Sequence, residues 1–271
     1  MTQNEWVSRH PYLKPIADLQ SLVRTKMETI CRSRAPTPNW GGYAGDYEAG
    51  VPLLGSNCIQ IDLTTVGQEL ASVIETLVFE PLPGNTAVEM RRLQAQLKYD
   101  PSAPSAAAAW LLVDDAWQPA HAGLLHYVGW TLLARHLRPL SKAFGEWRDE
   151  ERWLRGYCPL CGERPAMGQL TGTDPGRLRL LSCGRCETRW RYRRTGCPFC
   201  EKEDDHRLAS LAVEGEGGLR IDYCDVCGGY LKTYDGEGNE GVLLADWTSL
   251  HLDVIAGDRA LKRYAASLYE L

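Results

Sequence analysis

Apolar residues in the first half of the chain recur with the spacing of amphipathic helices. Between residues 59 and 80 they lie three and four positions apart, which is the repeat of one helix face buried against a core. These residues are Leu63, Val66, Leu70, Val73, Ile74, Leu77 and Val78. The same pattern predicts helices over residues 19–30, 86–97, 106–117 and 124–144, the last one broken or bent near Pro139. An all-helical region over residues 1–150 is therefore expected.

Helix-breaking prolines and glycines, and charged residues, limit where helices and membrane spans are expected. Prolines and glycines concentrate in residues 36–50 and predict an irregular loop there. Residues 122–140 are apolar enough to raise the alternative of a membrane span. Arg135, His136 and Arg138 interrupt the run before about 20 apolar residues accumulate. We therefore interpret this segment as a central helix of a bundle and expect no membrane span.

The second half of the chain contains a duplicated unit. Each copy consists of a Cys-x-x-Cys pair, a turn-rich loop, a short strand and a second Cys-x-x-Cys pair. Cys-Pro-Leu-Cys at residues 158–161 aligns with Cys-Pro-Phe-Cys at residues 197–200. Further along, Leu-Arg-Leu-Leu-Ser-Cys at residues 178–183 aligns with Leu-Arg-Ile-Asp-Tyr-Cys at residues 219–224. A repeat of this kind predicts two structural modules in tandem.

These patterns together predict an α+β fold. An all-helical N-terminal domain over residues 1–150 is followed by two tandem rubredoxin-like or zinc-ribbon-like metal-binding modules over residues 151–195 and 196–240. A C-terminal helix over residues 241–271 completes the chain, and Asp246 is expected to cap this helix as it runs towards Leu271.

Eight of the ten cysteines lie in the four Cys-x-x-Cys pairs. Disulfides of a secreted scaffold are the alternative, but residues 1–22 lack the basic segment and apolar run of a signal peptide. In the reducing cytosol, thiols clustered at this spacing bind metal more often than they form bridges. A cytoplasmic metal-binding protein is therefore expected, in which the other two cysteines, Cys31 and Cys58, are inert.

The repeat favours sequential pairing of the cysteine pairs over nested or interleaved pairing. The two pairs of each unit are then separated by 21 and 23 residues, close to the spacing of zinc ribbons and rubredoxins. Four thiolates suit zinc or a single iron ion. The expected ligands are Cys158, Cys161, Cys183 and Cys186 in site 1, and Cys197, Cys200, Cys224 and Cys227 in site 2.

The residues that follow the pairs differ. In each site one second cysteine is followed by glycine, which adopts positive φ readily. These glycines are Gly162 and Gly228, whereas Glu187 and Glu201 follow the second cysteine of the other two pairs. The full symmetry of a rubredoxin is therefore not expected.

Charge is concentrated beside the cysteines. The chain has a net charge of −5 and a pI near 5.7. Residues 177–194 nevertheless carry seven arginines, which admit three interpretations: a solvated face that offsets thiolate charge, a partner surface, or a nucleic-acid site. The acidic pI argues against nucleic-acid binding, for which a basic protein is expected. The arginines are Arg177, Arg179, Arg185, Arg189, Arg191, Arg193 and Arg194.

Signals for catalysis are weak. The chain has no nucleophile elbow, Walker loop or dinucleotide fingerprint, and Asp114 and Asp115 are interpreted as a helix-end or interface feature. Four cysteines fill every position around each metal, so no coordination site is left for a substrate. We therefore expect that the protein is not an enzyme. The histidines, which form no H-E-x-x-H motif, are His10, His121, His126, His136, His206 and His251.

The cysteine region resembles a known family. The segments around residues 158–165, 178–200 and 223–232, continuing through Leu-His-Leu-Asp at residues 250–253, are similar to the formate dehydrogenase accessory protein FdhE family. In the helical part, the only short stretch that resembles the family is Pro-Leu-Leu at residues 52–54. The resemblance implies a cytoplasmic maturation factor for respiratory formate dehydrogenase, which binds the catalytic subunit before its export and is not itself a dehydrogenase. It also implies metal ligation by all eight cysteines and favours iron over zinc.

Two other functions stay open. A rubredoxin-like electron-transfer module would change the oxidation state of its irons, and a structural zinc-ribbon protein would bind nucleic acid. The sequence does not indicate which residues contact a partner.

Overall fold

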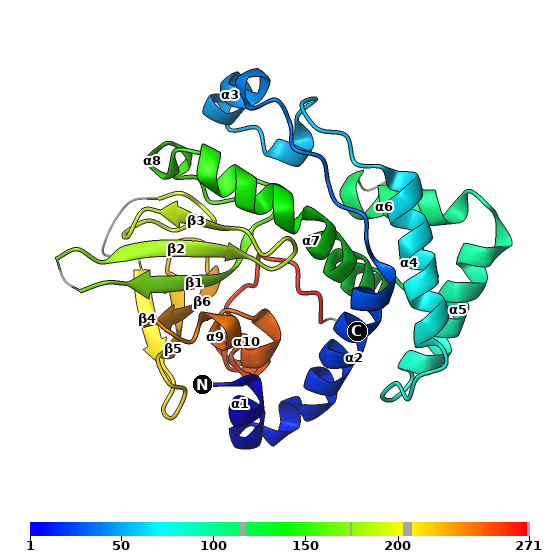
Figure 1. Cartoon of the computed structure of the whole chain (residues 1–271). Helices are drawn as coiled ribbons and strands as arrows, with labels where there is room; N and C mark the ends of the chain where they lie inside the picture. Colours follow the sequence, from blue (N-terminus) through cyan, green and yellow to red (C-terminus); the bar gives the residue numbers. More distant parts are fainter. Residues whose placement is uncertain (114–116, 174, 203–207, 270–271) are drawn as a thin grey trace. The chain divides into compact units, whose positions relative to one another are not determined.

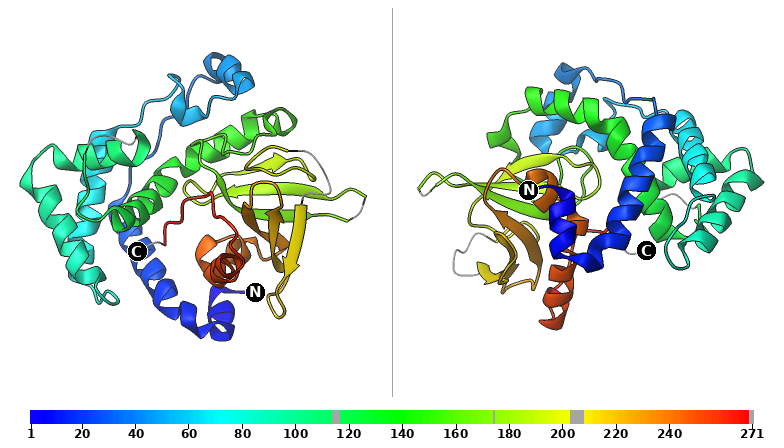
Figure 2. Two further views of the ribbon diagram at one scale, coloured as in Figure 1. Left: turned by 180° about the vertical axis from the view of Figure 1, so that it is seen from behind. Right: turned by 60° about the horizontal axis from the view of Figure 1, so that its bottom comes forward.

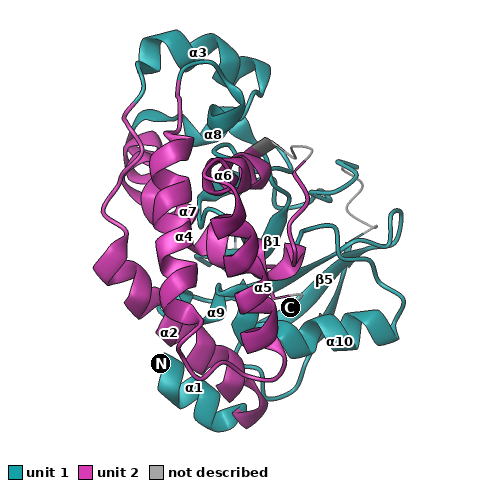
Figure 3. Ribbon diagram, turned by 90° about the vertical axis from the view of Figure 1, so that its right-hand side faces the viewer, with its two compact units in different colours: residues 1–10, 38–58, 147–267 teal, residues 11–37, 59–146, 268–271 magenta. Residues whose placement is uncertain are grey.

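The computed structural model describes residues 1–113, 117–173, 175–202 and 208–269 (Figure 1). The chain folds into two compact units, each assembled from separate segments (Figure 3). Unit 1 comprises residues 1–10, 38–58 and 147–267, and unit 2 comprises residues 11–37, 59–146 and 268–271. The predicted limits at residues 150, 195 and 240 describe sequential domains and stay a prediction.

Unit 2 is helical, as its apolar periodicity predicts. In α4 the apolar positions spaced three and four apart are buried, including Val66, Leu70 and Val73. The carboxylate of Asp62 accepts the N–H groups of Thr64 and Thr65 and so caps the helix. The helices are α2 (Lys14–Ile30), α4 (Leu63–Leu77), α5 (Thr86–Tyr99), α6 (Ala103–Val113) and α7 (Ala122–Trp147).

Helix α7 continues through Pro139 as one element. A proline removes one backbone hydrogen bond, but the helix buries apolar side chains on both sides of it, among them Leu133, Leu137, Leu140 and Phe144. This burial outweighs the lost bond, so the helix does not break at Pro139.

Residues 36–50 correct the sequence prediction, because most of them form a helix rather than a loop. Helix α3 (Trp40–Ala49) begins after Asn39, whose side chain accepts the N–H of Gly41. Tyr43 and Tyr47 are buried one turn apart and pack against Trp147 with ring centroids 5.7 and 5.5 Å away. Aromatic packing therefore overrides the low helix propensity of the glycines.

The strands of unit 1 form one six-stranded sheet in the order β3-β2-β1-β6-β5-β4 (Figures 1 and 2). Within each half the neighbours are antiparallel, but β1 and β6 pair in parallel, with Met167 opposite Lys232 and Leu170 opposite Asp235. The two repeats thus share a sheet. The strands are β1 (Pro165–Thr171), β2 (Leu178–Cys183), β3 (Arg189–Tyr192), β4 (Leu208–Ala212), β5 (Leu219–Cys224) and β6 (Tyr230–Asp235).

Short helices complete unit 1, and α10 packs against β5 (Figure 2). The α-helices are α1 (Gln3–Arg9), α3, α8 (Glu150–Trp153), α9 (Glu240–Leu243) and α10 (Leu250–Asp258). A helical unit 2 and a unit 1 that combines a sheet with short helices confirm the predicted α+β fold class.

The C-terminal helix is present but shorter than expected. Helix α10 follows a 3-10 turn that begins at Asp246, and it ends at Asp258 rather than near the end of the chain. The Asp246 carboxylate does not cap the helix, because it is buried against Lys232 and Arg263. After the helix, the backbone of Lys262 bonds to Gly228 and Tyr230, which draws the chain into a parallel bridge instead of another helical turn.

Candidate metal centres

The four Cys-x-x-Cys turns, here called knuckles, share one backbone design. The first and third knuckles precede β1 and β4, and the second and fourth begin at the last residues of β2 and β5. In each, the N–H of the first cysteine donates to the carbonyl five residues later. These bonds are Cys158 N to Glu163 O (2.8 Å), Cys183 N to Thr188 O (2.9 Å), Cys197 N to Lys202 O (3.2 Å) and Cys224 N to Gly229 O (2.9 Å).

The residue after the second cysteine is left-handed in every knuckle. Gly162 and Gly228 have φ of 80° and 70°, as their position predicts. Glu187 and Glu201 take the same conformation, with φ of 60° and 56°, although a side chain makes it costly. The knuckles therefore keep a common backbone where the sequence suggested two different types.

The sulfurs gather in the two predicted sets of four. Within each set, all ligand atoms lie within 4.8 Å of one another. Two sulfur–sulfur separations in site 1 are 3.4 Å (Cys158–Cys186) and 3.5 Å (Cys161–Cys183), and two in site 2 are 3.7 Å (Cys197–Cys227) and 3.9 Å (Cys200–Cys224).

These separations fit a metal ion and not disulfides. Metal–sulfur bonds of about 2.3 Å in a regular tetrahedron place the sulfurs about 3.8 Å apart, whereas a disulfide requires about 2.05 Å. Backbone N–H groups also point at the sulfurs: Arg185 N to Cys183, Phe199 N to Cys197 and Gly229 N to Cys227, each at 3.4 Å. Such bonds stabilise thiolate charge, and so the residues present fit a tetrathiolate centre.

Within each site, the pKa values of individual thiols are shifted in opposite directions. Burial raises the pKa of Cys158 well above that of an ordinary thiol. Burial acts the same way on Cys186, but hydrogen bonds from the neighbouring thiols outweigh it and lower the pKa of Cys186 well below the usual value. In site 2, burial raises the pKa of Cys197, while backbone and thiol hydrogen bonds overcome burial at Cys224 and lower its pKa. Cys186 in site 1 and Cys224 in site 2 are therefore the thiols with a lowered pKa, and binding of a metal cation requires the ligating thiols to lose their protons.

Site 1 is held from outside its own module by residues 52–54. The N–H groups of Leu53 and Leu54 donate to the carbonyls of Pro159 and Leu160, both at 2.9 Å, and Leu53 is fully buried. The Pro-Leu-Leu segment at residues 52–54 therefore holds the backbone of the first knuckle through two hydrogen bonds. Its role was not predicted, because nothing local in the sequence links a tripeptide to a knuckle 105 residues later.

The two sites are also linked to each other. A Cβ on Gly156, just before the first knuckle, would lie 1.9 Å from the carbonyl oxygen of Pro198 in the third knuckle. Arg164 donates to the same oxygen at 3.3 Å. Glycine at position 156 therefore permits direct packing of one knuckle on the other.

The remaining cysteines are not part of either site. Cys31 is buried, and burial raises its pKa to about 12, which keeps the thiol protonated at neutral pH. Cys58 is partly exposed.

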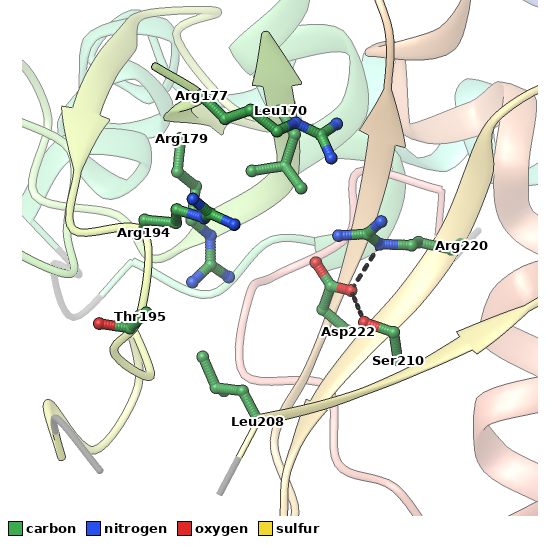
Figure 4. A pocket seen from close by; sticks show the side chains of 9 residues that line it. All are labelled: Leu170, Arg177, Arg179, Arg194, Thr195, Leu208, Ser210, Arg220 and Asp222. Carbon is green, nitrogen blue, oxygen red and sulfur yellow. Dashed lines mark hydrogen bonds and ion pairs between the residues drawn. The ribbon is translucent and has the colours of Figure 1, made fainter. Parts of the chain in front are cut away.

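The arginine run disperses in the structure. Arg185 pairs with Glu163 at 2.9 Å, Arg191 pairs with Glu151, and Arg189 donates to the side chain of Gln169. Three other members, Arg177, Arg179 and Arg194, line a pocket together with Arg220 of β5 (Figure 4), here called the arginine pocket.

A third group of ligating side chains was not predicted. His10, Glu216 and His251 come together although they are far apart in sequence. Nε2 of His10 and Nε2 of His251 lie 3.3 and 2.9 Å from Oε2 of Glu216, and the Nδ1 of His10 lies 3.0 Å from the carbonyl of Trp6. These contacts tie the N-terminal helix to α10. The acidic pair Asp114 and Asp115, and also His206, lie outside the described residues.

The fold and the paired tetracysteine clusters define a class of protein with a helical region and two joined rubredoxin-like modules. Comparison with known proteins narrows this class. Residues 157–194 match the family model for the central domain of FdhE. The resemblance to the FdhE family predicted from the cysteine region is thereby confirmed.

Two curated relatives and one solved structure are also similar to this chain. The FdhE homolog of Aquifex aeolicus is 30% identical over 132 residues, 47% of this chain and 47% of that protein. The FdhE of Salmonella paratyphi B is 34% identical over 128 residues, 46% of this chain and 41% of that protein. The match thus spans less than half the length of these relatives. The crystal structure of the FdhE protein from Pseudomonas aeruginosa has a TM-score of 0.60 and 23% identity, covering 95% of this chain and 88% of that chain, and so shares the fold.

Within the described residues, no helix combines the length and the apolar character that crossing a membrane would require.

Proposed function

We propose that this chain is an accessory protein for the maturation of respiratory formate dehydrogenase. It would bind the catalytic subunit in the cytoplasm before export and would not itself catalyse formate oxidation. The observation that carries the proposal is the pair of four-sulfur clusters on an FdhE fold. Eight cysteines arranged as two sets of four potential ligands indicate a role that depends on bound metal, which a purely helical scaffold would not need.

In this proposal each cluster holds one metal ion. Site 1 would use Cys158, Cys161, Cys183 and Cys186, and site 2 would use Cys197, Cys200, Cys224 and Cys227. A four-thiolate shell accepts iron or zinc, and the family resemblance favours iron. With all four positions filled by protein sulfur, the metal offers no place for a substrate, which supports a role in structure and recognition.

Rubredoxin-like electron transfer is the second candidate, and the exposure of site 2 favours it. Cys200 and Cys227 are partly accessible to solvent, whereas three of the four cysteines of site 1 are buried. An iron at site 2 would therefore lie near the surface. Reversible bleaching of a visible ferric–thiolate band on addition of dithionite would support this candidate, and a colourless zinc protein would dismiss it.

Co-purification with the catalytic subunit of formate dehydrogenase tests the accessory role. The tagged chain should retain this subunit from an extract, and the double substitution Cys197→Ser with Cys200→Ser should weaken retention. The matched control is Cys31→Ser with Cys58→Ser, which removes two thiols outside both sites and should leave retention unchanged. Fully active formate dehydrogenase in cells that lack this protein would contradict the proposed role.

A further inference from the structure

Three side chains with nitrogen and oxygen donor atoms converge in unit 1 outside the two cysteine sites. His10 follows α1, Glu216 lies in the turn between β4 and β5, and His251 is near the start of α10 (Figures 1 and 2). One donor atom of each residue lies within 4.8 Å of the other two. The three side chains are only 9%, 12% and 16% exposed, so the cluster is largely shielded from water.

The distances in this cluster suit the coordination shell of one ion. Oε2 of Glu216 lies 3.3 Å from Nε2 of His10 and 2.9 Å from Nε2 of His251. Ligand atoms at about 2.0–2.1 Å from a zinc ion lie about 3.3 Å apart in a tetrahedron and about 2.9 Å apart at right angles. Two imidazoles and one carboxylate are also a ligand set that proteins use for zinc and other divalent transition metals.

The backbone orients the ring of His10 for metal binding. Its Nδ1 lies 3.0 Å from the carbonyl oxygen of Trp6. Because a carbonyl can only accept, Nδ1 carries the proton, and the lone pair of the neutral ring is on Nε2, which faces Glu216. Metal-binding histidines commonly donate their other ring N–H to a backbone carbonyl in this way. Trp6 is itself held in place, since it is fully buried and its Nε1 donates to the carbonyl of Thr248 at 2.9 Å.

A metal ion would satisfy the three groups without placing protons on two stacked rings. The Nε2 lone pair of neutral His10 and the carboxylate of Glu216 are both acceptors, so a positive species belongs between them. The rings of His10 and His251 stack with centroids 5.4 Å apart, and protonating both would bring like charges together. Burial also lowers the pKa of His251 despite the carboxylate beside it, which favours the neutral ring that binds metal.

We propose that His10, Glu216 and His251 bind one divalent transition-metal ion of the zinc class, which fastens α1 and α10 to the turn between β4 and β5. Three protein ligands leave one position of a tetrahedral shell for water or an outside ligand. We expect this ion to be held less tightly than an ion with four thiolate ligands, and to be lost when the protein is purified without added metal. The inference concerns residues outside both cysteine sites and does not rest on the accessory role.

Isothermal titration of the full chain with zinc chloride tests the proposal. Sites 1 and 2 are kept loaded, loosely held metal is removed by a weak chelator, and the pH is about 7.5, above the ordinary histidine pKa of about 6.5. Elemental analysis of the titrated protein should then give one ion more per chain than before. The melting temperature should rise with added zinc, because the ion binds only the folded protein. Absence of saturable binding at millimolar zinc would overturn the proposal and leave the cluster as a protonated ion pair.

Variants locate the binding. Glu216→Gln, in a turn, and His251→Gln should each weaken zinc binding by about 10–100-fold or more, since even the partners of metal ligands contribute that much. Both should also abolish the rise in melting temperature with zinc. A purely structural role of these residues would lower the melting temperature without changing its dependence on zinc.

His126→Gln is the matched control, because it removes an imidazole that stacks on Trp110 in unit 2. Its zinc affinity should equal that of wild type. Glu216→Gln keeps the test valid if His251→Gln fails to fold, since it retains both imidazoles and the length of the side chain. Equal zinc affinity in Glu216→Gln and wild type would overturn the assignment of the site to these residues.

Discussion

Lys232 carries a positive charge into the interior of unit 1, where it is only 1% exposed. Its Nζ lies 2.7 Å from Asp246 and 2.8 Å from Asp253, and Arg263 contacts the same two carboxylates at 2.8 and 2.7 Å. Two cations and two anions thus balance within the network. Because both cations face Asp246, they overcome the effect of burial and lower the pKa of its carboxyl group to about 2.

Asp246→Asn should destabilise the protein by about 3–5 kcal/mol, since it leaves buried positive charge without its partner. Asp258→Asn, at the exposed end of α10, is the control and should change stability by less than about 0.5 kcal/mol. Urea denaturation of the metal-loaded protein measures both. Equal stability of the two variants would show that the network contributes little.

The same network predicts a pH dependence. The pKa of Asp246 is lower in the folded protein than its ordinary value of 3.8, so its stabilising effect is complete above that value and is lost as pH falls towards about 2. Wild type should lose this contribution between pH 4 and pH 2, whereas Asp246→Asn should lack that part of the acid transition.

A substitution at Glu201 tests the cost of the left-handed backbone that follows each Cys-x-x-Cys pair. Left-handed backbone costs a residue with a side chain about 1–2 kcal/mol, and glycine costs about 0.5–1 kcal/mol in chain entropy. Glu201→Gly should therefore stabilise the metal-loaded protein by roughly 0.5–1 kcal/mol. Glu201→Ala removes the charge but keeps Cβ, so its stability should stay near that of wild type. A gain of equal size in both variants would attribute the effect to charge instead.

Among the elements, the two repeats depend on close contact between the first and third knuckles. Gly156→Ala would place a methyl group against the Pro198 carbonyl, and backbone cannot move aside as a side chain can. A loss of about 1–3 kcal/mol is expected, as for other overpacked sites. Gly241→Ala in α9 is the control, because nothing lies within 4 Å of its added Cβ. Thermal melts of unchanged shape and midpoint for Gly156→Ala would mean that this contact is not required.

The elements that the sequence predicts are those with a local signal. The spacing of Val66, Leu70 and Val73 predicts α4, and the repeated Cys-x-x-Cys pairs predict the two sets of four sulfurs. Helix α3 was missed because its formation depends on the packing of Tyr43 and Tyr47 against Trp147, which outweighs the glycine content.

At the scale of the whole molecule, the sequence predicts the fold class but not how the repeats combine. The parallel pairing of β1 with β6 joins residues 65 positions apart, such as Met167 and Lys232, and no local pattern encodes it. The arginine pocket, which is lined from β2 and β5, and the support of site 1 by residues 52–54 also depend on contacts between residues far apart in sequence. Both are therefore visible only in the structure.

The metal content of the freshly purified chain tests most directly whether each tetracysteine cluster holds one metal ion. Elemental analysis after anaerobic purification should give two ions of iron or zinc per chain. Cys197→Ser with Cys200→Ser should reduce this to one, and Cys31→Ser with Cys58→Ser should leave it at two. A content near zero in the native chain, with its thiols oxidised to disulfides, would contradict the account.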